Sequence, residues 1–455
     1  MTTSTSFLGD LMVSIADRGR SLLGIQAAQV DPAGRVDVAA LFEALLSGRG
    51  EASGVALATE ILCVWQKLDT DGRRAFLTTL AERFGPDQAK LDRAIESYRA
   101  EPSAKTIMNL HKAAEPRRQE VIRRLNLAPH GTEALVRIRE ELARHLKSHP
   151  DLEALDADFA HLFSSWFNRG FLVLRPIDWS TPANILERII RYEAVHAIQN
   201  WDDLRNRLQP DDRRCYGFFH PRLPNTPLIF VEVALVDRIS EGIVPLLDEA
   251  AAPVKADRAT TAVFYSISNT QEGLRGVSFG DSLIKRVVET LQQELPRLKT
   301  FATLSPIPGF RGWFARNAGS LLSRLDEKRQ TELGRVVGSL PPTVERVLAA
   351  AESPGALDAK SPVRQLLMSA AAEYLGRATA EGKPVDPVAR FHLGNGARVE
   401  RLNWAGDPSP KGLKQSYGLM VNYLYDLKRL DKHRALLAQG KVAVSGDIDD
   451  LFLKG

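Results

Sequence analysis

A strand, a glycine-bearing loop and a helix follow one another in the second half of the chain. The run TTAVFYSIS, from Thr260 to Ser268, has the β-branched and aromatic composition of a half-buried strand. It leads into GLRGVSFGDSLIKRVVETL (residues 273–291), which starts with closely spaced glycines and ends as an amphipathic helix. Gly276 and Gly280 let a ligand approach the backbone, and the amides and dipole of the first helical turn favour an anion. The alternative is a turn that only lets strand and helix pack tightly.

Polar residues also stand at the ends of apolar segments at three other places. The segments are FFHPRLPNTPLIFVEVAL, TLSPIPGF and DPVARFHLGNGARVERLNW. In the last of these, His392 follows a proline-marked start and precedes a Gly-Asn-Gly turn, where its ring could project into a cleft. Taken alone, a single histidine is more often structural, and a serine before proline, such as Ser305, is usually a turn former. We interpret His220 as structural, because Pro221 and the turn after it explain its position.

The composition excludes several classes of protein. Lys plus Arg number 60 and Asp plus Glu 56, a net charge of +4 that is too small for a duplex-binding surface. Cys63 and Cys215 are the only cysteines, which indicates a reducing, cytoplasmic setting and no metal site of the cysteine type. No apolar run reaches membrane-spanning length, and Asp10 and Asp17 argue against a secretion signal. We therefore expect no nucleic-acid partner and no membrane.

The pattern of apolar residues changes near residue 165. From Ser6 to Phe167 it is helical almost throughout, which predicts seven or eight helices and no strand. Further on, FLVLRPI, RCYGFFH, PLIFVEVAL, TTAVFYSIS, TFATLS and ARVERLNW read as strands between helical segments, with a last helix near LMVNYLYDLKRL. We predict an α+β chain with a helical domain over residues 1–165 and a mixed α/β sheet domain over residues 166–455.

These motifs, taken together and in this order, resemble the malonyl-CoA decarboxylase family. The resemblance runs from Trp166 to about Tyr425, whereas the helical part is consistent with the family but less diagnostic. It implies a GNAT-type acyltransferase fold, which binds coenzyme A through an Arg/Gln-x-x-Gly-x-Gly loop. Here Ser278 replaces the first motif glycine, so the loop geometry is expected to differ slightly. The residues expected to hold the coenzyme A diphosphate are Arg275, Gly276, Val277, Ser278, Phe279, Gly280 and Asp281.

The resemblance also implies roles for three other residues. His392 matches the family's acid, and its ordinary pKa of about 6.5 would let it hold a proton and release it to a carbanion. Ser305 matches the catalytic serine, whose hydroxyl orients the leaving carboxyl group. Tyr425 aligns with a tyrosine near the site and is a candidate for contact with substrate. Lys285 and Arg286 are either countercharges to the diphosphate or exposed helix positions.

The implied reaction turns malonyl-CoA into acetyl-CoA and carbon dioxide. The thioester accepts the electron pair, so neither a metal nor a cofactor is expected beyond the coenzyme A of the substrate. Two alternatives remain: a GNAT-type acyltransferase that uses the same loop, and a non-catalytic acyl-CoA sensor. The resemblance further implies a homo-oligomer, with a tetramer favoured, that assembles through the helical domain.

Overall fold

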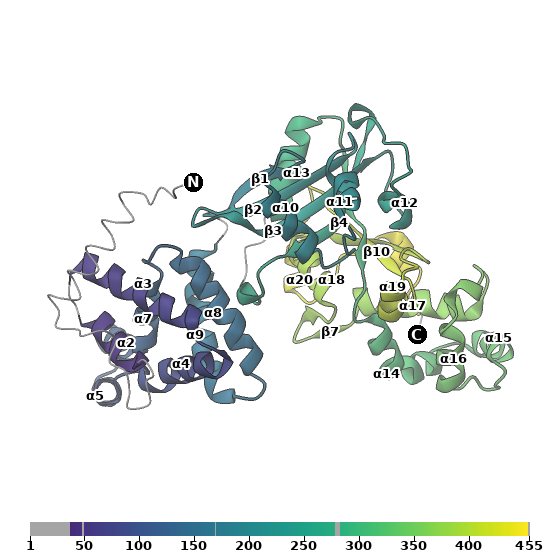
Figure 1. Cartoon of the computed structure of the whole chain (residues 1–455). Helices are drawn as coiled ribbons and strands as arrows, with labels where there is room; N and C mark the ends of the chain where they lie inside the picture. The colour runs from purple at the N-terminus through teal and green to yellow at the C-terminus, as the bar shows by residue number, and fades with distance from the viewer. Residues whose placement is uncertain (1–36, 48–49, 169, 278–282, 454–455) are drawn as a thin grey trace. The chain divides into compact units, whose positions relative to one another are not determined.

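The computed structural model of the chain describes residues 37–47, 50–168, 170–277 and 283–453 (Figure 1). The chain divides into two compact units, and each is described by itself. The first contains the residues up to Leu172, together with His220–Pro224 and a segment that starts at Gln271; the second contains the remainder. The sequence suggests a boundary after residue 165, and in the structure the main division comes at Leu172.

The first unit is helical in its described N-terminal part. Aspartate or serine side chains before several helices accept hydrogen bonds from first-turn amides, as Asp37, Asp69 and Ser103 do. None of the described residues between 37 and 172 lies in a strand, which agrees with the expectation for this region. The helices are α2 (Val38–Leu46), α3 (Glu51–Lys67), α4 (Thr70–Arg83), α5 (Gln88–Ala100), α6 (Ala104–Ala114), α7 (Arg117–Leu125), α8 (Gly131–His145), η1 (Pro150–Leu152), α9 (Glu153–Trp166) and, in the segment after Gln271, η3 (Glu272–Leu274).

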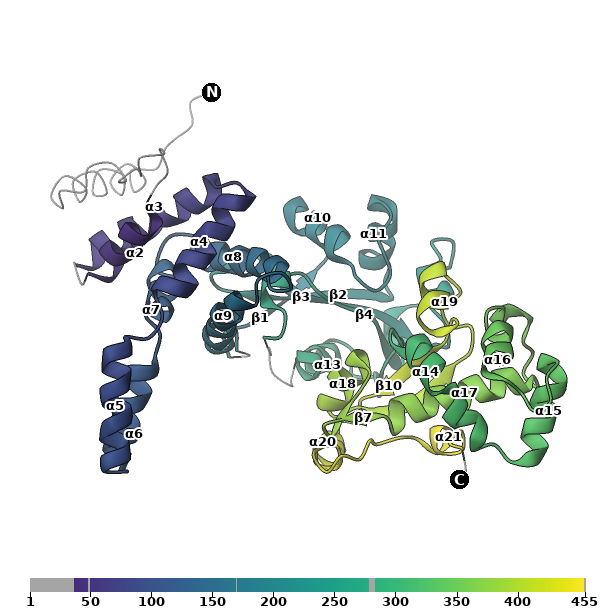
Figure 2. The same cartoon turned by 90° about the horizontal axis from the view of Figure 1, so that it is seen from below.

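Aromatic side chains form part of the core of this unit. The ring of Phe42 lies 5.0 Å from that of Phe76 and 5.3 Å from that of Phe84, in edge-on contacts that join α2 to α4. By contrast, α5 and α6 lie side by side as a hairpin with no fully buried residue (Figure 2). Their apolar residues Ile107 and Met108 are 55% and 50% exposed. The core therefore depends on the other helices rather than on this hairpin.

A mixed sheet organises the second unit. Its strands follow the order β1-β2-β3-β4-β5-β10-β6, and β9 pairs with β10. The pair β4–β5 is parallel, whereas β10 is antiparallel to each of its neighbours. The strands are β1 (Val173–Ile177), β2 (Arg213–His220), β3 (Leu223–Val236), β4 (Thr261–Asn269), β5 (Thr300–Thr303), β6 (Ser305–Pro306), β9 (Arg398–Asn403) and β10 (Met420–Leu424), with a separate small ribbon of β7 (Thr379–Ala380) and β8 (Lys383–Pro384).

Helices cover both faces of this sheet (Figure 2). On one face, α10 (Ala183–Tyr192) and α11 (Trp201–Leu208) pack through buried Ile189 and Leu204 onto Phe219 and Phe230 of the strands. On the other face lies α13 (Leu283–Glu294), which connects the parallel strands β4 and β5. This arrangement confirms the expected α+β fold class, a helical region followed by a mixed sheet domain.

The remaining helices lie between or after the strands of the second unit in the chain. They are α12 (Val244–Leu247), η2 (Ala256–Arg258), α14 (Phe310–Ser323), α15 (Glu327–Val337), α16 (Val344–Ala351), η4 (Pro354–Ala356), α17 (Pro362–Gly376), α18 (Pro387–Gly394), α19 (Pro410–Ser416), α20 (Leu430–Ala438) and α21 (Gly446–Asp449). Within the described part of the chain, none of the helices combines the length and the apolar character needed to cross a lipid bilayer.

The expectation of a helix near residues 419–430 is wrong. Residues 420–424 form strand β10, and the next helix begins only at Leu430. Strand β10 pairs with β5 and β6 along one edge and with β9 along the other, and its residues are buried nearly throughout. A strand buried on both faces loses the alternation of polar and apolar residues that identifies a strand in a sequence.

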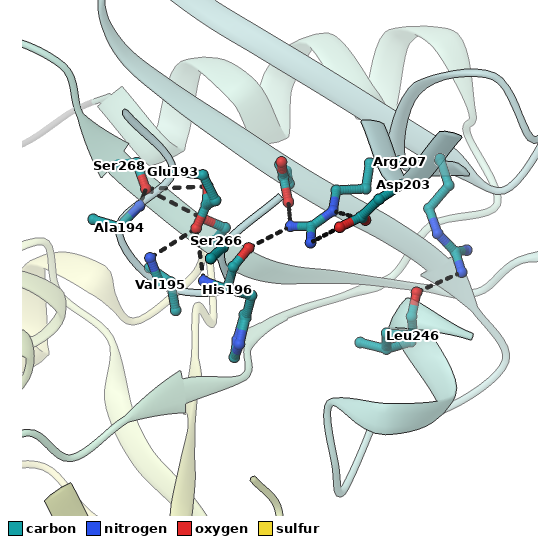
Figure 3. A network of polar contacts seen from close by, with 12 residues as sticks. Glu193, Ala194, Val195, His196, Asp203, Arg207, Leu246, Ser266 and Ser268 are labelled. Carbon is teal, nitrogen blue, oxygen red and sulfur yellow. Dashed lines mark hydrogen bonds and ion pairs between the residues drawn. The ribbon is translucent and has the colours of Figure 1, made fainter. Parts of the chain in front are cut away.

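A buried polar network ties the covering helices to β3 and β4 (Figure 3). The Glu193 carboxylate accepts hydrogen bonds from the hydroxyls of Ser266 and Ser268 on β4. Arg207 of α11 donates to Asp203 and, at 3.1 Å, to Glu232 of β3. Burial raises the pKa of Glu232 to about 8, although the Arg207 guanidinium opposes that rise. These contacts tie the segment between α10 and α11 to strands β3 and β4.

Candidate active site

Helix α18 carries His392 and begins at a buried aspartate. Asp386 is fully buried, and its Oδ1 accepts hydrogen bonds at 2.9 Å from the amides of Val388 and Ala389 in the first turn. Pro387 occupies the first helical position, where the missing N–H costs nothing. The helix is thus held firmly at its start, and His392 lies in its last turn, on the buried side.

Both ring nitrogens of His392 have a hydroxyl partner. Nε2 lies 3.3 Å from the Ser305 Oγ, and Nδ1 lies 2.7 Å from the Tyr425 hydroxyl. The ring of Tyr423 stacks on the imidazole, with 4.7 Å between ring centroids and 26° between planes. The structure therefore brings together His392, Ser305 and Tyr425, which are far apart in the sequence.

Strand pairing fixes the serine side of this cluster. Ser305 lies in β6, opposite Val421 of β10. Its hydroxyl donates to Thr303 Oγ1 at 2.9 Å, and the same oxygen accepts the backbone N–H of Tyr423 at 3.1 Å. Since Ser305 donates its hydrogen to Thr303, its oxygen is free to accept one from the imidazole.

One placement of hydrogens satisfies these contacts. Nε2–H of His392 donates to Ser305, and Nδ1 accepts the hydroxyl hydrogen of Tyr425. We therefore assign a neutral imidazole protonated at Nε2, because the Ser305 hydroxyl already donates to Thr303. The hydrogen nearest to Ser305 is therefore the one that the ring can give away, and Tyr425 holds the ring in this tautomer.

Burial keeps this imidazole neutral. It lowers the pKa of His392 from its ordinary value of 6.5 to about 3, because the charged ring would lose its hydration. Burial also raises the pKa of Tyr425 well above that of an ordinary phenol, so the hydroxyl keeps its proton. The expectation that His392 has its ordinary pKa does not fit these surroundings, because burial keeps the ring neutral at pH 7.

The glycine-bearing loop belongs to the first unit, so it is described separately from His392. Arg139 of α8 donates hydrogen bonds of 3.0 Å to the backbone oxygens of Gly273 and Arg275. A Cβ on Gly273 would lie 2.0 Å from the Val136 carbonyl oxygen, so the loop approaches α8 as closely as only glycine allows.

The described part of this loop ends at residue 277. Gly276 has a φ of 80°, and a Cβ there would meet nothing within 4 Å. Arg275 and Val277 flank it in the described structure. The expected ligands Ser278, Phe279, Gly280 and Asp281 lie outside the described residues.

Comparison with known proteins decides the family. Residues 170–455 match the family model of the malonyl-CoA decarboxylase C-terminal domain, and residues 84–167 match that of the N-terminal domain. The chain belongs to the malonyl-CoA decarboxylase family.

Several members of the malonyl-CoA decarboxylase family resemble the chain over most of its length. The mitochondrial malonyl-CoA decarboxylase of the goose Anser anser anser is 34% identical over 401 residues, which are 82% of this chain and 78% of that protein. The crystal structure of malonyl-CoA decarboxylase from Rhodopseudomonas palustris is 53% identical with a TM-score of 0.80, covering 91% of this chain and 98% of that one. The corresponding structure from Agrobacterium vitis is 52% identical with a TM-score of 0.81, covering 92% and 100%.

In this member of the malonyl-CoA decarboxylase family, sequence reasoning missed two residues that touch the cluster. Thr303 stands two residues before Ser305, and Tyr423 stands two before Tyr425. Alternate residues of a strand share a face, so each would have been found by counting two positions back from its partner. Tyr423 was missed because residues 419–430 were expected to form a helix, in which residues two positions apart do not share a face.

Proposed function

We propose that the chain decarboxylates malonyl-CoA to acetyl-CoA and carbon dioxide. Membership of the malonyl-CoA decarboxylase family supports the substrate. The observation that carries the chemistry is the buried imidazole of His392, with Nε2 toward Ser305 and Nδ1 toward Tyr425. Such a ring, held in one tautomer next to a hydroxyl, suits delivery of a proton to a carbanion.

The proposed reaction needs only a few groups. The bond between C2 and the carboxylate breaks, carbon dioxide leaves, and the electron pair moves onto the thioester oxygen. When substrate binds, the Ser305 hydroxyl turns its hydrogen from Thr303 to the departing carboxylate and orients it, and His392 gives its Nε2 proton to C2. We propose that no cofactor takes part, because the thioester carbonyl itself accepts the electron pair.

An assay without an acceptor separates this proposal from its alternatives. Purified protein supplied with malonyl-CoA alone should release carbon dioxide and form an equal amount of acetyl-CoA. An acyltransferase would need an amine before it turned over, and an acyl-CoA sensor would release no carbon dioxide. A protein that binds malonyl-CoA but forms no acetyl-CoA would contradict the proposal.

We further propose that residues 275–281 hold the coenzyme A diphosphate. The position of this loop directly before α13 supports the proposal, since free amides at a helix start attract phosphates. Gly280→Val should weaken coenzyme A binding about tenfold or more, because the branched side chain would fill the space that the diphosphate enters. Calorimetry on the folded variant measures this, with Gly355→Val in a short helical turn as the control. An unchanged dissociation constant would remove the loop from the site.

Assembly and location remain proposals. The exposed apolar residues Ile107 and Met108 of the α5–α6 hairpin support subunit contacts through the helical region, in a tetramer. Light scattering that showed a monomer at micromolar concentration would overturn this. We place the protein in the cytoplasm because its cysteines fit a reducing compartment: Cys215 is buried in the core, and burial raises the pKa of its thiol. A cell fraction with the activity in another compartment would contradict that placement.

A further inference from the structure

A neutral imidazole cannot give up its only ring proton without help. If His392 passed its Nε2 hydrogen to C2 and received nothing in return, it would become an imidazolate, which a buried site does not stabilise. A proton arriving at Nδ1 during the transfer avoids this. The group at Nδ1 is the Tyr425 hydroxyl, at 2.7 Å. Tyr425 must then be resupplied, because the proposed reaction consumes one proton per turnover.

A small cavity lies on the Tyr425 side of the ring. Tyr425 and Asn395 both line it, and its volume of about 10 Å³ has room for about one water molecule. Lys285 and Arg434 also line it, and their side chains are 56% and 36% exposed, so the cavity lies between the buried tyrosine and solvent. The other lining residues are Ile284, Val288, Leu427 and Leu430.

Asn395, which lines this cavity, carries a buried acceptor. It follows α18, and its Nδ2 donates to the Phe391 carbonyl oxygen at 2.7 Å. That contact determines which end of the amide is nitrogen, because two oxygens would repel each other at this distance. Oδ1 is buried and has no hydrogen-bond partner among the described residues. Buried amide oxygens normally accept a hydrogen bond, and a water molecule in the cavity would donate one.

We propose that a water molecule held by Asn395 in this cavity passes a proton through Tyr425 to His392 during decarboxylation. The inference rests on the proposed function. As Nε2–H goes to C2, the Tyr425 hydroxyl hydrogen goes to Nδ1, the water gives a hydrogen to the Tyr425 oxygen, and solvent restores the water. The imidazole stays neutral throughout, and one proton from solvent is consumed.

The tautomer is reset after product leaves. Nε2 takes up a proton from a water molecule that replaces the product, and Nδ1 returns its own to Tyr425, from which one proton passes back to the cavity water. This step consumes no net proton. Asn395 and Tyr425 act through His392, so they are positioning residues of a relay, whereas His392 alone contacts the reacting carbon.

Two substitutions of Asn395 distinguish a relay from a structural role. Asn395→Leu keeps the volume of the side chain among apolar neighbours but makes the cavity wall apolar, so the water loses its anchor. Asn395→Ala also loses the hydrogen bond to Phe391, yet it leaves space for water beside Tyr425. The two variants lose the same protein contact and differ in access of water, so each is the matched control of the other.

We expect the leucine variant to lower kcat about tenfold or more and to increase the solvent isotope effect, as proton delivery becomes limiting. The alanine variant should keep kcat within about threefold, and both should keep KM for malonyl-CoA within about threefold. Thermal melting shows whether both remain folded.

Three results would overturn the relay. Equal losses of kcat in the two variants would assign Asn395 a structural role. A rise in KM with kcat preserved would make Asn395 a contact of the substrate. Full activity of the folded leucine variant would show that the proton takes another route. In each case the wild-type protein still releases carbon dioxide; failure of the proposed function is different, because wild-type protein would then release none.

Discussion

Replacing His392 by asparagine should reduce decarboxylation about 10²- to 10⁴-fold, the range that general acid catalysis contributes. Asparagine keeps a polar group of similar reach, but it cannot pass on a proton at neutral pH. Coenzyme A should bind as it does to the wild-type protein, because the proposed diphosphate loop lies elsewhere in the chain. The rate of carbon dioxide release and the affinity for coenzyme A, measured on the same sample, test this.

His220→Asn is the matched control for this substitution. His220 is also a buried histidine, with its ring 5.0 Å from that of Phe167 in the first unit. Replacing His220 should leave turnover within about threefold of the wild-type value. In heavy water the wild-type reaction should place one deuterium at C2 of acetyl-CoA. If the His392 variant kept full turnover, or lost coenzyme A affinity in step with activity, His392 would not be the proton donor.

The protonation state of His392 can be followed directly. A histidine with its ordinary pKa gains a proton as the pH falls through about 6.5, whereas the pKa of about 3 keeps this ring neutral down to low pH. Nitrogen NMR of labelled protein should therefore show a neutral imidazole with hydrogen on Nε2 between about pH 5 and 8. The His392→Asn variant assigns the signal. Titration near pH 6.5 would show that the ring is less shielded from water than the structure indicates.

Ser305→Ala should lower kcat about 10- to 100-fold and change KM by no more than about threefold. The hydroxyl accepts the Nε2 hydrogen of His392 and is proposed to orient the departing carboxyl group. Both interactions matter most while the bond breaks, so their loss is expected in turnover rather than in binding. Steady-state kinetics with malonyl-CoA measure both constants.

Thr303→Ser is the control for the serine substitution. It keeps the oxygen that accepts hydrogen bonds from Ser305 and from the Tyr423 amide, and it removes one buried methyl group. We expect a small loss of stability, about 1 kcal/mol, and turnover within about threefold of the wild type. Normal turnover of the Ser305→Ala variant would show that Ser305 has no catalytic role and only shapes the turn before Pro306.

Much of the fold could be predicted from the sequence because it depends on local patterns. Helical periodicity predicted the N-terminal helices, which form through neighbours in the chain. β-Branched and aromatic runs predicted β4 and its neighbours. Residues 420–424 were misread because β10 lies between other strands, and its nearly continuous burial removes the alternation that a sequence would reveal.

The candidate active site, too, could be predicted only in part from the sequence. Motifs quoted from the sequence pointed to His392, Ser305 and Tyr425, since the family resemblance depends only on residue types in order. The distances between them depend on the sheet: β6 places Ser305 next to β10, and α18 brings His392 to both hydroxyls. No spacing along the chain predicts contacts across such separations.

Residue types by themselves determined the family and identified the groups capable of the chemistry. Only the tertiary structure decided the protonation state of His392, because a pKa depends on the water and charges around a group rather than on its neighbours in sequence. The same holds for Asn395: its type says that it can accept a hydrogen bond, but only the packing of α13, α18 and α20 leaves that acceptor buried beside Tyr425. Burial is a property of the folded chain, and the chemistry of this site depends on it.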